Sequence, residues 1–426
     1  MTKINFLPIL TVLCLTAFEI AALDRYVSPY GANNPPYANW ADAATNIQWA
    51  VDAAASGETV WVTNGTYYLT NEISVTKSNL TIRSVNGRDL TIVDGNNYAG
   101  KPVTNRCIRF WDAGAGGVLD GFTVSNGYSI TVQGGGGVYC SLSNQIRNCR
   151  IVLNGASGTG GEGIYMGGGM IANCEIANNS GSAAGGIYLI GGLAQNCQIA
   201  SNSSCGLYSG AGSTTIYCTI IGNTNGGADC SGVIQNCTVK NNKGTYAGIF
   251  LRSGGIVLNC LITENVGDGS GGVYFNSGGT LENCTVVSNY SIPFNTVGGV
   301  NINTRGTLRN CISYGNMVGG GSRSNYYRSA AGSATDTFWI NSCALPEMAY
   351  TNVTVINSIY TNPAFVSFSG KNFRLARGSP CINAGTNQDW MTNAVDLDGA
   401  TRIWNSVVDI GCFEYWVPNG TIITVP

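Results

Sequence analysis

Histidine is absent from the 426 residues of this chain. Its absence excludes imidazole general bases, Ser-His-Asp triads and the histidine ligands on which most catalytic zinc sites depend. Any catalysis would therefore have to use carboxylates, tyrosine, lysine, arginine or a hard cation such as calcium.

Charged residues are scarce as well. They make up 10% of the sequence, and the formal net charge is −2. So small a charge provides no electrostatic footprint for nucleic acid, and the lack of charge argues against long, solvated helices. A hydrophobic content of 44% excludes general disorder. The composition, with 59 glycines, predicts a folded chain with many turns and no nucleic-acid partner.

Long apolar runs are missing beyond the N-terminus, which predicts that the mature chain has no transmembrane segment. The opening MTKINFLPILTVLCLTAFEIAA combines an early lysine, an apolar run and small residues, as a secretory signal peptide does. We expect cleavage near Ala22, and a secreted or cell-surface protein. Cys14 would leave with the signal, so 15 of the 16 cysteines would meet conditions in which disulfides form.

A phrase of the form Cys-x-(Ile/Val)-x-x-Asn recurs every 19 to 27 residues. Its cysteines are Cys149, Cys174, Cys197, Cys218, Cys237, Cys260, Cys284 and Cys311. Its closing asparagines are Asn154, Asn179, Asn202, Asn223, Asn242, Asn265, Asn289 and Asn316. A second phrase lies between these, such as GIYM from Gly163 and GIYL from Gly186. Repetition at this period is typical of a solenoid.

Alternation within both phrases has a period of two, which predicts strands. Cys174 and Ile176 share one face and Glu175 takes the other; Ile187 likewise opposes Tyr188. One repeat has room for three short strands and three turns. That is one coil of a parallel β-helix, stacked on the next at ~4.8 Å.

The inward columns have structural explanations. Asparagines at the same bend of each coil could pass amide hydrogen bonds along a ladder. The cysteines could fill space as small hydrophobes, form occasional disulfides between coils, or bind metal. Packing is favoured, because zinc needs ligands that converge on one point and a column spreads them along an axis. Three further cysteines lie outside the column and could pair: Cys140, Cys205 and Cys230.

An exposed coil end needs a cap. The segment NIQWAVDAAASG places Ile47, Ala50, Val51 and Ala54 on one helical face, with Gly57 as the stop signal. We expect a short amphipathic helix that covers the N-terminal end of the β-helix.

Three stretches resemble known families. The segment NIQWAVDAAASGETVWVTNGTYYL resembles the start of pectate-lyase-like right-handed β-helix proteins. The alternation of GGVY with C-x-I-x-x-N is similar to the GGA(I/L/V) and FxxN repeats of chlamydial polymorphic outer-membrane proteins, with Cys replacing Phe. NPAFVSFSGKNFRLARGSPCINAG, followed by VDLDGATRIWNSVVDIGCFEY, resembles the C-terminal module of bacterial choice-of-anchor Q proteins.

These resemblances imply a secreted, all-β, right-handed parallel β-helix of roughly ten or more coils. The expected organisation is a signal peptide (1–22), an N-terminal cap with a short helix (23–57), β-helix repeats (58–343), and a choice-of-anchor Q-like module that closes the solenoid (344–426). No single function follows, because such folds include adhesins and polysaccharide-degrading enzymes.

Two features of the C-terminal module follow from the resemblance. Cys381 and Cys412 replace small residues of the family pattern, which suggests a disulfide between them; the alternative is two unrelated buried thiols. The module also concentrates charged residues that could form a calcium site or an ion-paired, turn-forming end. The second interpretation is favoured, so we expect no metal: Asp396, Asp398, Arg402, Asp409 and Glu414.

The outward residues of the Gly phrases form a column that we call the Tyr stripe: Tyr139, Tyr165, Tyr188, Tyr208, Asp229, Phe250, Tyr274 and Asn301. Arg252, Asn276 and Asn303 follow two residues further along the same face. Aromatic rings with polar neighbours suit a sugar chain. The alternative is that stacked aromatics only stabilise the sheet.

Two functions follow from the stripe. The first is binding of an extracellular polysaccharide or cell-surface glycan through Tyr165, Tyr188, Tyr208, Phe250, Tyr274, Asn276 and Asn301. The second is a polysaccharide lyase or glycoside hydrolase. Its base would be Arg252, or else Lys240 or Lys243. The general acid, or the ligand of a calcium ion, would be Asp229, Glu264 or Asp268. The few carboxylates favour binding.

Overall fold

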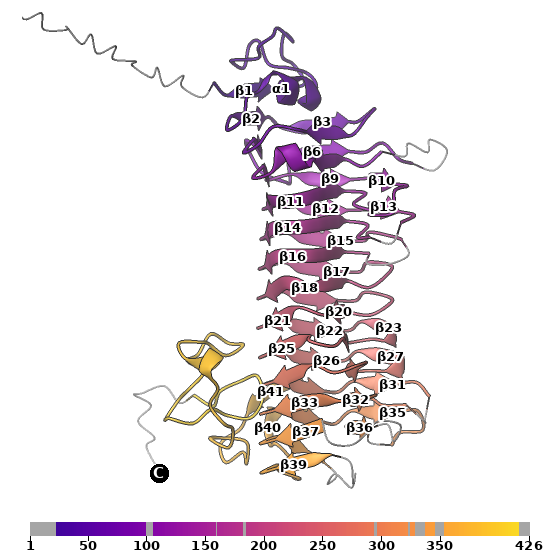
Figure 1. Ribbon diagram of the computed structural model, residues 1–426, viewed down its shortest axis with the longest axis vertical. Helices are drawn as coiled ribbons and strands as arrows, with labels where there is room; N and C mark the ends of the chain where they lie inside the picture. Colours follow the sequence, from indigo (N-terminus) through magenta and orange to yellow (C-terminus); the bar gives the residue numbers. More distant parts are fainter. Residues whose placement is uncertain are drawn as a thin grey trace, which may run out of the picture.

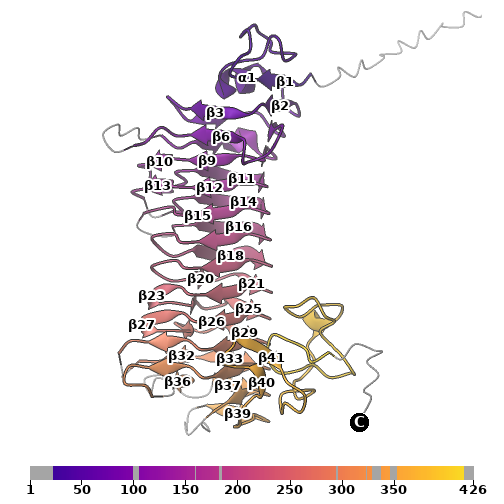
Figure 2. The same cartoon turned by 180° about the vertical axis from the view of Figure 1, so that it is seen from behind.

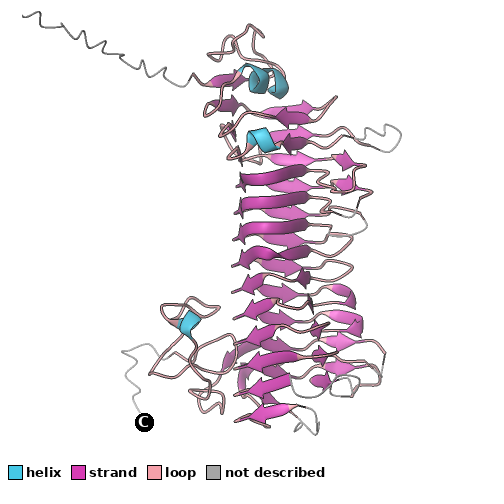
Figure 3. Ribbon diagram, viewed as in Figure 1, coloured by secondary structure: helices cyan, strands magenta, loops and turns pink. Residues whose placement is uncertain are grey.

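The computed structural model describes residues 23–98, 105–158, 160–181, 185–293, 296–322, 324–328, 337–345 and 353–416. The chain is an all-β right-handed parallel β-helix of about 11 turns, which confirms the fold predicted from the repeats. Figures 1 and 2 show the coils stacked along the long axis of the molecule, and Figure 3 shows how little of it is helical. The predicted signal peptide lies outside the described residues.

The Cys-x-Ile phrases form a parallel sheet of 12 strands. Its strands are β3 (Gly65–Tyr68), β6 (Thr91–Asp94), β9 (Thr123–Ser125), β12 (Arg150–Val152), β15 (Glu175–Ala177), β17 (Gln198–Ala200), β19 (Thr219–Ile221), β22 (Thr238–Lys240), β26 (Leu261–Thr263), β30 (Thr285–Val287), β34 (Ile312–Tyr314) and β38 (Cys343–Ala344).

A sheet of 21 strands contains the Gly phrases and the segments that lead into each cysteine. Its strands are β1 (Arg25–Val27), β2 (Thr59–Val62), β4 (Ile73–Val75), β5 (Thr81–Ser84), β7 (Ile108–Phe110), β8 (Val118–Asp120), β11 (Val138–Arg147), β14 (Ile164–Ala172), β16 (Ile187–Gln195), β18 (Leu207–Ile216), β20 (Ala228–Cys230), β21 (Val233–Gln235), β24 (Ile249–Leu251), β25 (Ile256–Leu258), β28 (Val273–Phe275), β29 (Thr280–Glu282), β32 (Val300–Ile302), β33 (Gly306–Arg309), β36 (Tyr326–Arg328), β37 (Thr337–Ile340) and β39 (Thr354–Ile356).

Small sheets and short helices complete the described fold. The small sheets are β10 (Tyr128–Ser129) with β13 (Gly155–Ala156); β23 (Lys243–Tyr246), β27 (Val266–Ser270), β31 (Tyr290–Ser291) and β35 (Met317–Val318); and the antiparallel pair β40 (Phe365–Ser367) and β41 (Asn372–Leu375). The helices are α1 (Ile47–Ala53), η1 (Asp112–Gly114) and η3 (Asp389–Met391). Across the described ranges, no helix is long and apolar enough to cross a bilayer.

The inward asparagines form the predicted ladder. The side-chain amide of Asn202 donates to Oδ1 of Asn223 at 2.9 Å and to the carbonyl oxygen of Ile176 at 3.2 Å. The same Oδ1 accepts the backbone N–H of Asn202 at 3.0 Å. Equivalent bonds run from Asn154 to the end of the ladder at Asn325. These buried amides are satisfied by the coils on either side, which is why the position requires asparagine.

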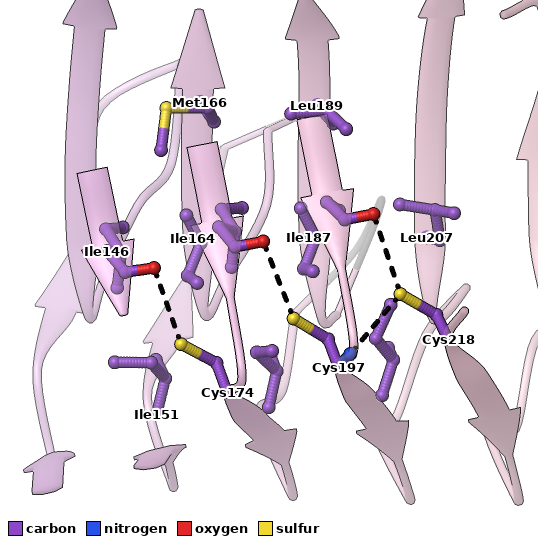
Figure 4. Close-up of a cluster of buried hydrophobic side chains, with 14 of the residues drawn as sticks. Ile146, Ile151, Ile164, Met166, Cys174, Ile187, Leu189, Cys197, Leu207 and Cys218 are labelled. Carbon is purple, nitrogen blue, oxygen red and sulfur yellow. Dashed lines mark hydrogen bonds between the residues drawn. The ribbon is translucent and has the colours of Figure 1, made fainter. Parts of the chain in front are cut away.

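The cysteine column is packing, as predicted. All eight thiols are buried, and Figure 4 shows three of them among isoleucines and leucines. Each thiol donates to a carbonyl, as Cys197 does to Gln195 at 3.1 Å, while the N–H of Cys197 donates to Sγ of Cys218 at 3.4 Å. Burial raises the pKa of the Cys284 and Cys311 thiols. Every cysteine of the described chain is free, so no disulfide joins neighbouring coils there.

Helix α1 confirms the predicted cap at the N-terminal end. The Asn46 side chain accepts the N–H of Gln48 at 2.8 Å, and Ile47, Ala50 and Val51 are buried. The apolar face therefore covers the first coils instead of leaving them open to water. The helix ends before Gly57, which lies in the following turn with φ of +84°.

The C-terminal segment lies beside the later coils, where Figures 1 and 2 show it in yellow. A second, outward column of asparagines holds it there. These residues directly precede the column cysteines or their replacements and have positive φ. Asn283 donates to the carbonyl oxygen of Asp409 at 3.1 Å, and Asn310 donates to that of Thr386 at 2.9 Å. Asn259 donates to the carbonyl oxygen of Val395 at 3.1 Å.

Candidate functional site

The Tyr stripe exists as a column in register. Tyr165 pairs with Tyr139 across β11 and β14, and Tyr188 pairs with Tyr165 across β14 and β16. Pairing continues through Tyr208, Asp229, Phe250, Tyr274 and Asn301. The aromatic members are all half-buried, so they lie on the outer face of the sheet as period-two alternation predicted.

The rings of the first half turn their faces to one another. Centroids of Tyr139 and Tyr165 are 4.9 Å apart, those of Tyr165 and Tyr188 5.7 Å, and those of Tyr188 and Tyr208 4.2 Å. The planes within each pair differ by less than 10°. Because the faces are turned to one another, this half of the stripe presents ring edges and hydroxyl groups, rather than ring faces, to a sugar chain.

Asp229 interrupts the ring stack and opens a cavity. The carboxylate binds Arg252 through two bonds, Oδ1 to Nε at 2.6 Å and Oδ2 to Nη2 at 2.7 Å. A cavity of about 280 Å³ lies beside this pair. Its lining residues are Cys205, Asn225, Gly226, Ala228, Asp229, Thr245, Tyr246, Phe250 and Arg252.

Tyr246, on the loop strand β23, supplies an aromatic wall of this cavity. Its ring centroid lies 4.9 Å from that of Phe250 and 4.2 Å from that of Tyr274. The Arg252 guanidinium lies 5.0 Å from the Phe250 centroid, a cation–π distance. Tyr246 comes from outside the Gly phrase, so repeat alignment could not place it in the stripe.

The N-terminal end of the stripe carries arginines that the sequence analysis also missed. Arg109 occupies the stripe position one coil before Tyr139. Its guanidinium lies 3.3 Å from the Trp111 centroid and 5.2 Å from that of Tyr139. Arg106 lies 4.9 Å from the Tyr139 centroid and forms an ion pair with Glu72 at 3.6 Å.

Two hydroxyls of the stripe have raised pKa values. Burial, together with Tyr208 and other neighbours, raises the pKa of Tyr188. Burial and the nearby Tyr246 raise the pKa of Tyr274 to about 12. Tyr188 and Tyr274 are therefore protonated at neutral pH, where each phenol donates and accepts hydrogen bonds and does not act as a proton-abstracting phenolate.

The residues considered for catalysis do not all meet. Glu264 lies at the turn after β26, on the other long sheet, and forms an ion pair with Lys371. Glu264 therefore does not lie beside Asp229, which corrects its place among the candidate catalytic residues. The expectation that Arg252 is a base is wrong as well. Its bonds to Asp229 raise the pKa of the guanidinium, so the side chain keeps its proton. The exposed Asp268 does not line the Asp229 cavity.

Two amides extend the stripe beyond Tyr274. Asn301 pairs in register with Tyr274 on one side and with Tyr327 on the other. The carbonyl oxygen of Asn276 accepts the amide of Asn303 at 3.2 Å. Both Asn276 and Asn301 are half-buried, so polar groups continue the surface after the rings end.

The suggested disulfide in the C-terminal module is wrong. Cys381 and Cys412 are both free and lie in different hydrophobic clusters. Cys381 packs with Cys343 of β38, whereas Cys412 packs with Phe373 and Val287. Each thiol thus belongs to the contact between the module and the β-helix, which explains why both are buried.

The carboxylates of the module are used by the protein itself. Asp396 accepts the N–H groups of Asp398, Ala400 and Glu414 at 2.8 to 2.9 Å. Glu414 lies 3.3 Å from the fully buried Arg402. Within the described ranges, no group of three or more acidic or cysteine residues is arranged to hold a metal ion. This arrangement is the turn-forming, ion-paired end considered above.

Comparison with known proteins gives limited similarity. No protein-family model matches the chain, so the choice-of-anchor Q-like module and the chlamydial repeats remain resemblances. Pectate lyase PEL9 of Emericella nidulans is 37% identical over 89 residues, which are 20% of this chain. The matched segment spans about a fifth (21%) of that relative's length.

Solved structures match the chain weakly. Pectate lyase Pel9A matches with a TM-score of 0.48 and 17% identity over 93% of this chain and 98% of that one. The A-module of mannuronan C-5 epimerase AlgE6 from Azotobacter vinelandii matches with a TM-score of 0.44 and 16% identity over 74% of this chain and 94% of that module. With TM-scores below 0.5 and identities below 20%, neither likeness carries an argument about this chain.

Proposed function

We propose that this chain is a secreted or cell-surface scaffold that binds an extracellular polysaccharide or cell-surface glycan along the Tyr stripe. The observation that carries the proposal is the cavity at the Asp229 break, where the ring stack stops and a polar ion pair begins. Aromatic walls with a few fixed polar groups are the usual composition of a sugar site.

Each part of the stripe has a distinct role in this proposal. Tyr246 and Phe250 give apolar surface to a sugar at the break, while Asp229 and Arg252 meet its hydroxyl groups. The stacked tyrosines before the break present a row of hydroxyls to the next sugars. The β-helix fixes these groups on rigid strands, so little side-chain entropy is lost on binding.

The test is titration calorimetry of the purified protein against soluble pectin, alginate and neutral polysaccharides. Tyr246→Ser and Asp229→Asn should each weaken binding about tenfold, or ~1.4 kcal/mol. Tyr68→Ser is the matched control, because that tyrosine is 63% exposed and lies on β3, away from the stripe. Equal affinity in wild type and both site variants would contradict the proposal.

A second candidate is a polysaccharide lyase or glycoside hydrolase. It is favoured by the local identity with pectate lyase PEL9. The site chemistry weighs against it, because Asp229 is the one carboxylate among the described residues that line the cavity, and Arg252 already binds it. Uronate polymers incubated with the protein would yield unsaturated products that absorb in the ultraviolet if it is a lyase. Turnover abolished by Asp229→Ala would replace the binding proposal.

A further inference from the structure

A second cavity lies where the C-terminal segment meets the 12-stranded sheet. It has a volume of about 390 Å³ and lies between strands β22 and β26 on one side and strand β41 on the other. Its lining residues are Thr238, Lys240, Leu261, Thr263, Glu264, Lys371, Phe373, Arg374, Leu397, Asp398 and Phe413. None of these residues belongs to the Tyr stripe, which runs on the other long sheet.

One of the cations that line this cavity has no carboxylate partner there. Arg374 binds Asp398 through two bonds of 2.5 Å, and Lys371 forms the ion pair with Glu264. The two pairs neutralise all the carboxylates that line the cavity. Lys240 is half-buried at the end of β22, and among the described residues no acidic side chain lies within ion-pair distance of it.

An adjoining cavity of about 670 Å³ shares Arg374 and Asp398 with the first. Trp404, Tyr415 and Trp416 contribute aromatic surface to it, and Trp416 is 51% exposed. The Arg374–Asp398 pair therefore lies between a cavity with an uncompensated cation and one with aromatic walls. Two further carboxylates, Asp396 and Glu414, also line the second cavity. Asp396 accepts backbone N–H groups, and Glu414 pairs with Arg402. We call the two cavities together the junction groove.

We propose that the junction groove binds an acidic saccharide. The Lys240 ammonium pairs with the carboxylate of a sugar acid, because a cation in a partly enclosed site gains more from a counter-ion than one in bulk water. The indole rings of Trp404 and Trp416 cover the apolar face of a sugar ring, and the Arg374–Asp398 pair offers donors and acceptors to its hydroxyls. This site is independent of the Tyr stripe.

The bland alternative is that Lys240 is an ordinary solvated lysine whose stem covers apolar surface. Two features distinguish the groove from that case. Lysine and arginine outnumber the carboxylates in the first cavity by three to two. The groove also exists only because the C-terminal segment is held against the coils by the outward asparagines, so it is built from both parts of the chain.

The test is titration of the full chain with sodium glucuronate and with glucose, followed by calorimetry and tryptophan fluorescence. Glucuronate should bind and quench the fluorescence, and glucose should bind at least tenfold more weakly. Lys240→Gln should weaken glucuronate binding about tenfold, while the control Arg305→Gln, which removes one positive charge at an exposed position outside the groove, should bind as wild type does. Trp416→Ser should reduce both affinity and quenching.

Other outcomes separate this site from the stripe. Tyr246→Ser should leave glucuronate affinity unchanged; a loss there would assign the sugar acid to the Tyr stripe and overturn the groove. Unchanged affinity in Lys240→Gln would also overturn it, as would equal binding of glucose and glucuronate. Polygalacturonate that binds more tightly than glucuronate, and also depends on Lys240, would support the groove and identify a polymer as its ligand rather than a free sugar acid.

Discussion

The repeated phrase Asn-Cys-x-Ile-x-x-Asn contains two asparagines with different roles. The last, such as Asn265, is fully buried and joins the coils through its side-chain amide. The first, such as Asn259, adopts positive φ of 52° at a bend, a conformation that short polar side chains tolerate. Asparagine thus serves two purposes in the repeat: its side-chain amide bonds the coils together, and its tolerance of positive φ allows the bend.

Removing one ladder amide should cost several kilocalories. In Asn223→Ala, the N–H and side-chain amide of Asn202 lose their common acceptor, and the amide bonds that Asn223 donates to Asn242 and Ile199 also disappear. With ~1–3 kcal/mol for each unsatisfied buried group, we expect about 2–4 kcal/mol of destabilisation. Urea unfolding followed by circular dichroism measures this loss. Asn64→Ala, at an exposed turn, is the control and should change stability by less than about 0.5 kcal/mol.

The cysteine column should tolerate serine better than a larger side chain. Ser342 follows Cys311 in the column, where its hydroxyl accepts the N–H of Cys311 at 3.1 Å and donates to Ile340 at 3.0 Å. Cys260→Ser can use the equivalent bonds, so we expect a loss below about 1.5 kcal/mol, whereas Cys260→Leu should cost about 1–3 kcal/mol through overpacking. Thermal unfolding of the two variants checks the order, and a less stable serine variant would contradict it.

At the residue scale the sequence predicted columns well and orientations poorly. Period-two alternation is enough to decide that Tyr188 lies outside and Ile187 inside. It does not decide ring orientation, which depends on the spacing between coils, so the face-to-face stacking of Tyr188 on Tyr208 was not foreseen. Lys240 was considered as a base, and only the docked C-terminal segment shows that it lies in a cavity.

Strands and turns were the most predictable elements. The strands of the repeats and the cap helix are set by residues close together in the sequence. Such local patterns predict the structure well when every coil packs against coils of the same kind. The C-terminal segment contains fewer regular elements, and its position depends on long-range bonds such as that between Asn283 and Asp409. The outward asparagines have the positive φ expected of residues at turns, so nothing in the sequence indicated that they also hold another part of the chain.

Arg402 is the element-scale test of that attachment. It is fully buried; its guanidinium donates to Asn259 at 3.0 Å and to the carbonyl oxygen of Gly411, and it lies beside Glu414. Arg402→Gln removes the buried guanidinium that bonds Asn259 and Gly411 and neighbours Glu414, so we expect a loss of about 3–5 kcal/mol confined to the C-terminal segment.

Limited proteolysis and amide exchange measure this local loss. Cleavage in residues 360–416 should accelerate strongly, while exchange within the strands β12 to β19 stays slow. The control is Arg305→Gln, which replaces an exposed arginine of the β-helix. Global unfolding of Arg402→Gln without early cleavage of the C-terminal segment would contradict a separately attached unit.

At the scale of the whole molecule, buried acids predict sensitivity to alkali. Burial raises the pKa of Cys230 from 9.0 to about 12, and it also raises the pKa of Cys140. The unfolded chain therefore loses these protons above pH 9 while the folded chain keeps them. Stability is complete below pH 9 and falls as the pH rises, by up to about 1.4 kcal/mol for each such thiol at pH 10.

Thermal melts between pH 8 and pH 10 check this sign. The melting temperature should fall over that range, and the double variant Cys140→Ala, Cys230→Ala should show a shallower fall, although its starting stability is lower. A melting temperature that stays constant or rises from pH 8 to pH 10 would show that these thiols ionise equally in both states.

The asparagine ladder has a consequence for how such a molecule changes length over evolutionary time. Each ladder asparagine bonds to an asparagine in the coil before it and to one in the coil after it. The contact between two coils is therefore the same however many coils precede it. Unequal recombination within the gene could insert or delete one complete coil before Asn236, where the C-terminal segment is not docked, and leave every remaining joint chemically identical. The length of the β-helix can therefore change by whole coils, and the sequences at its two ends need not change with it.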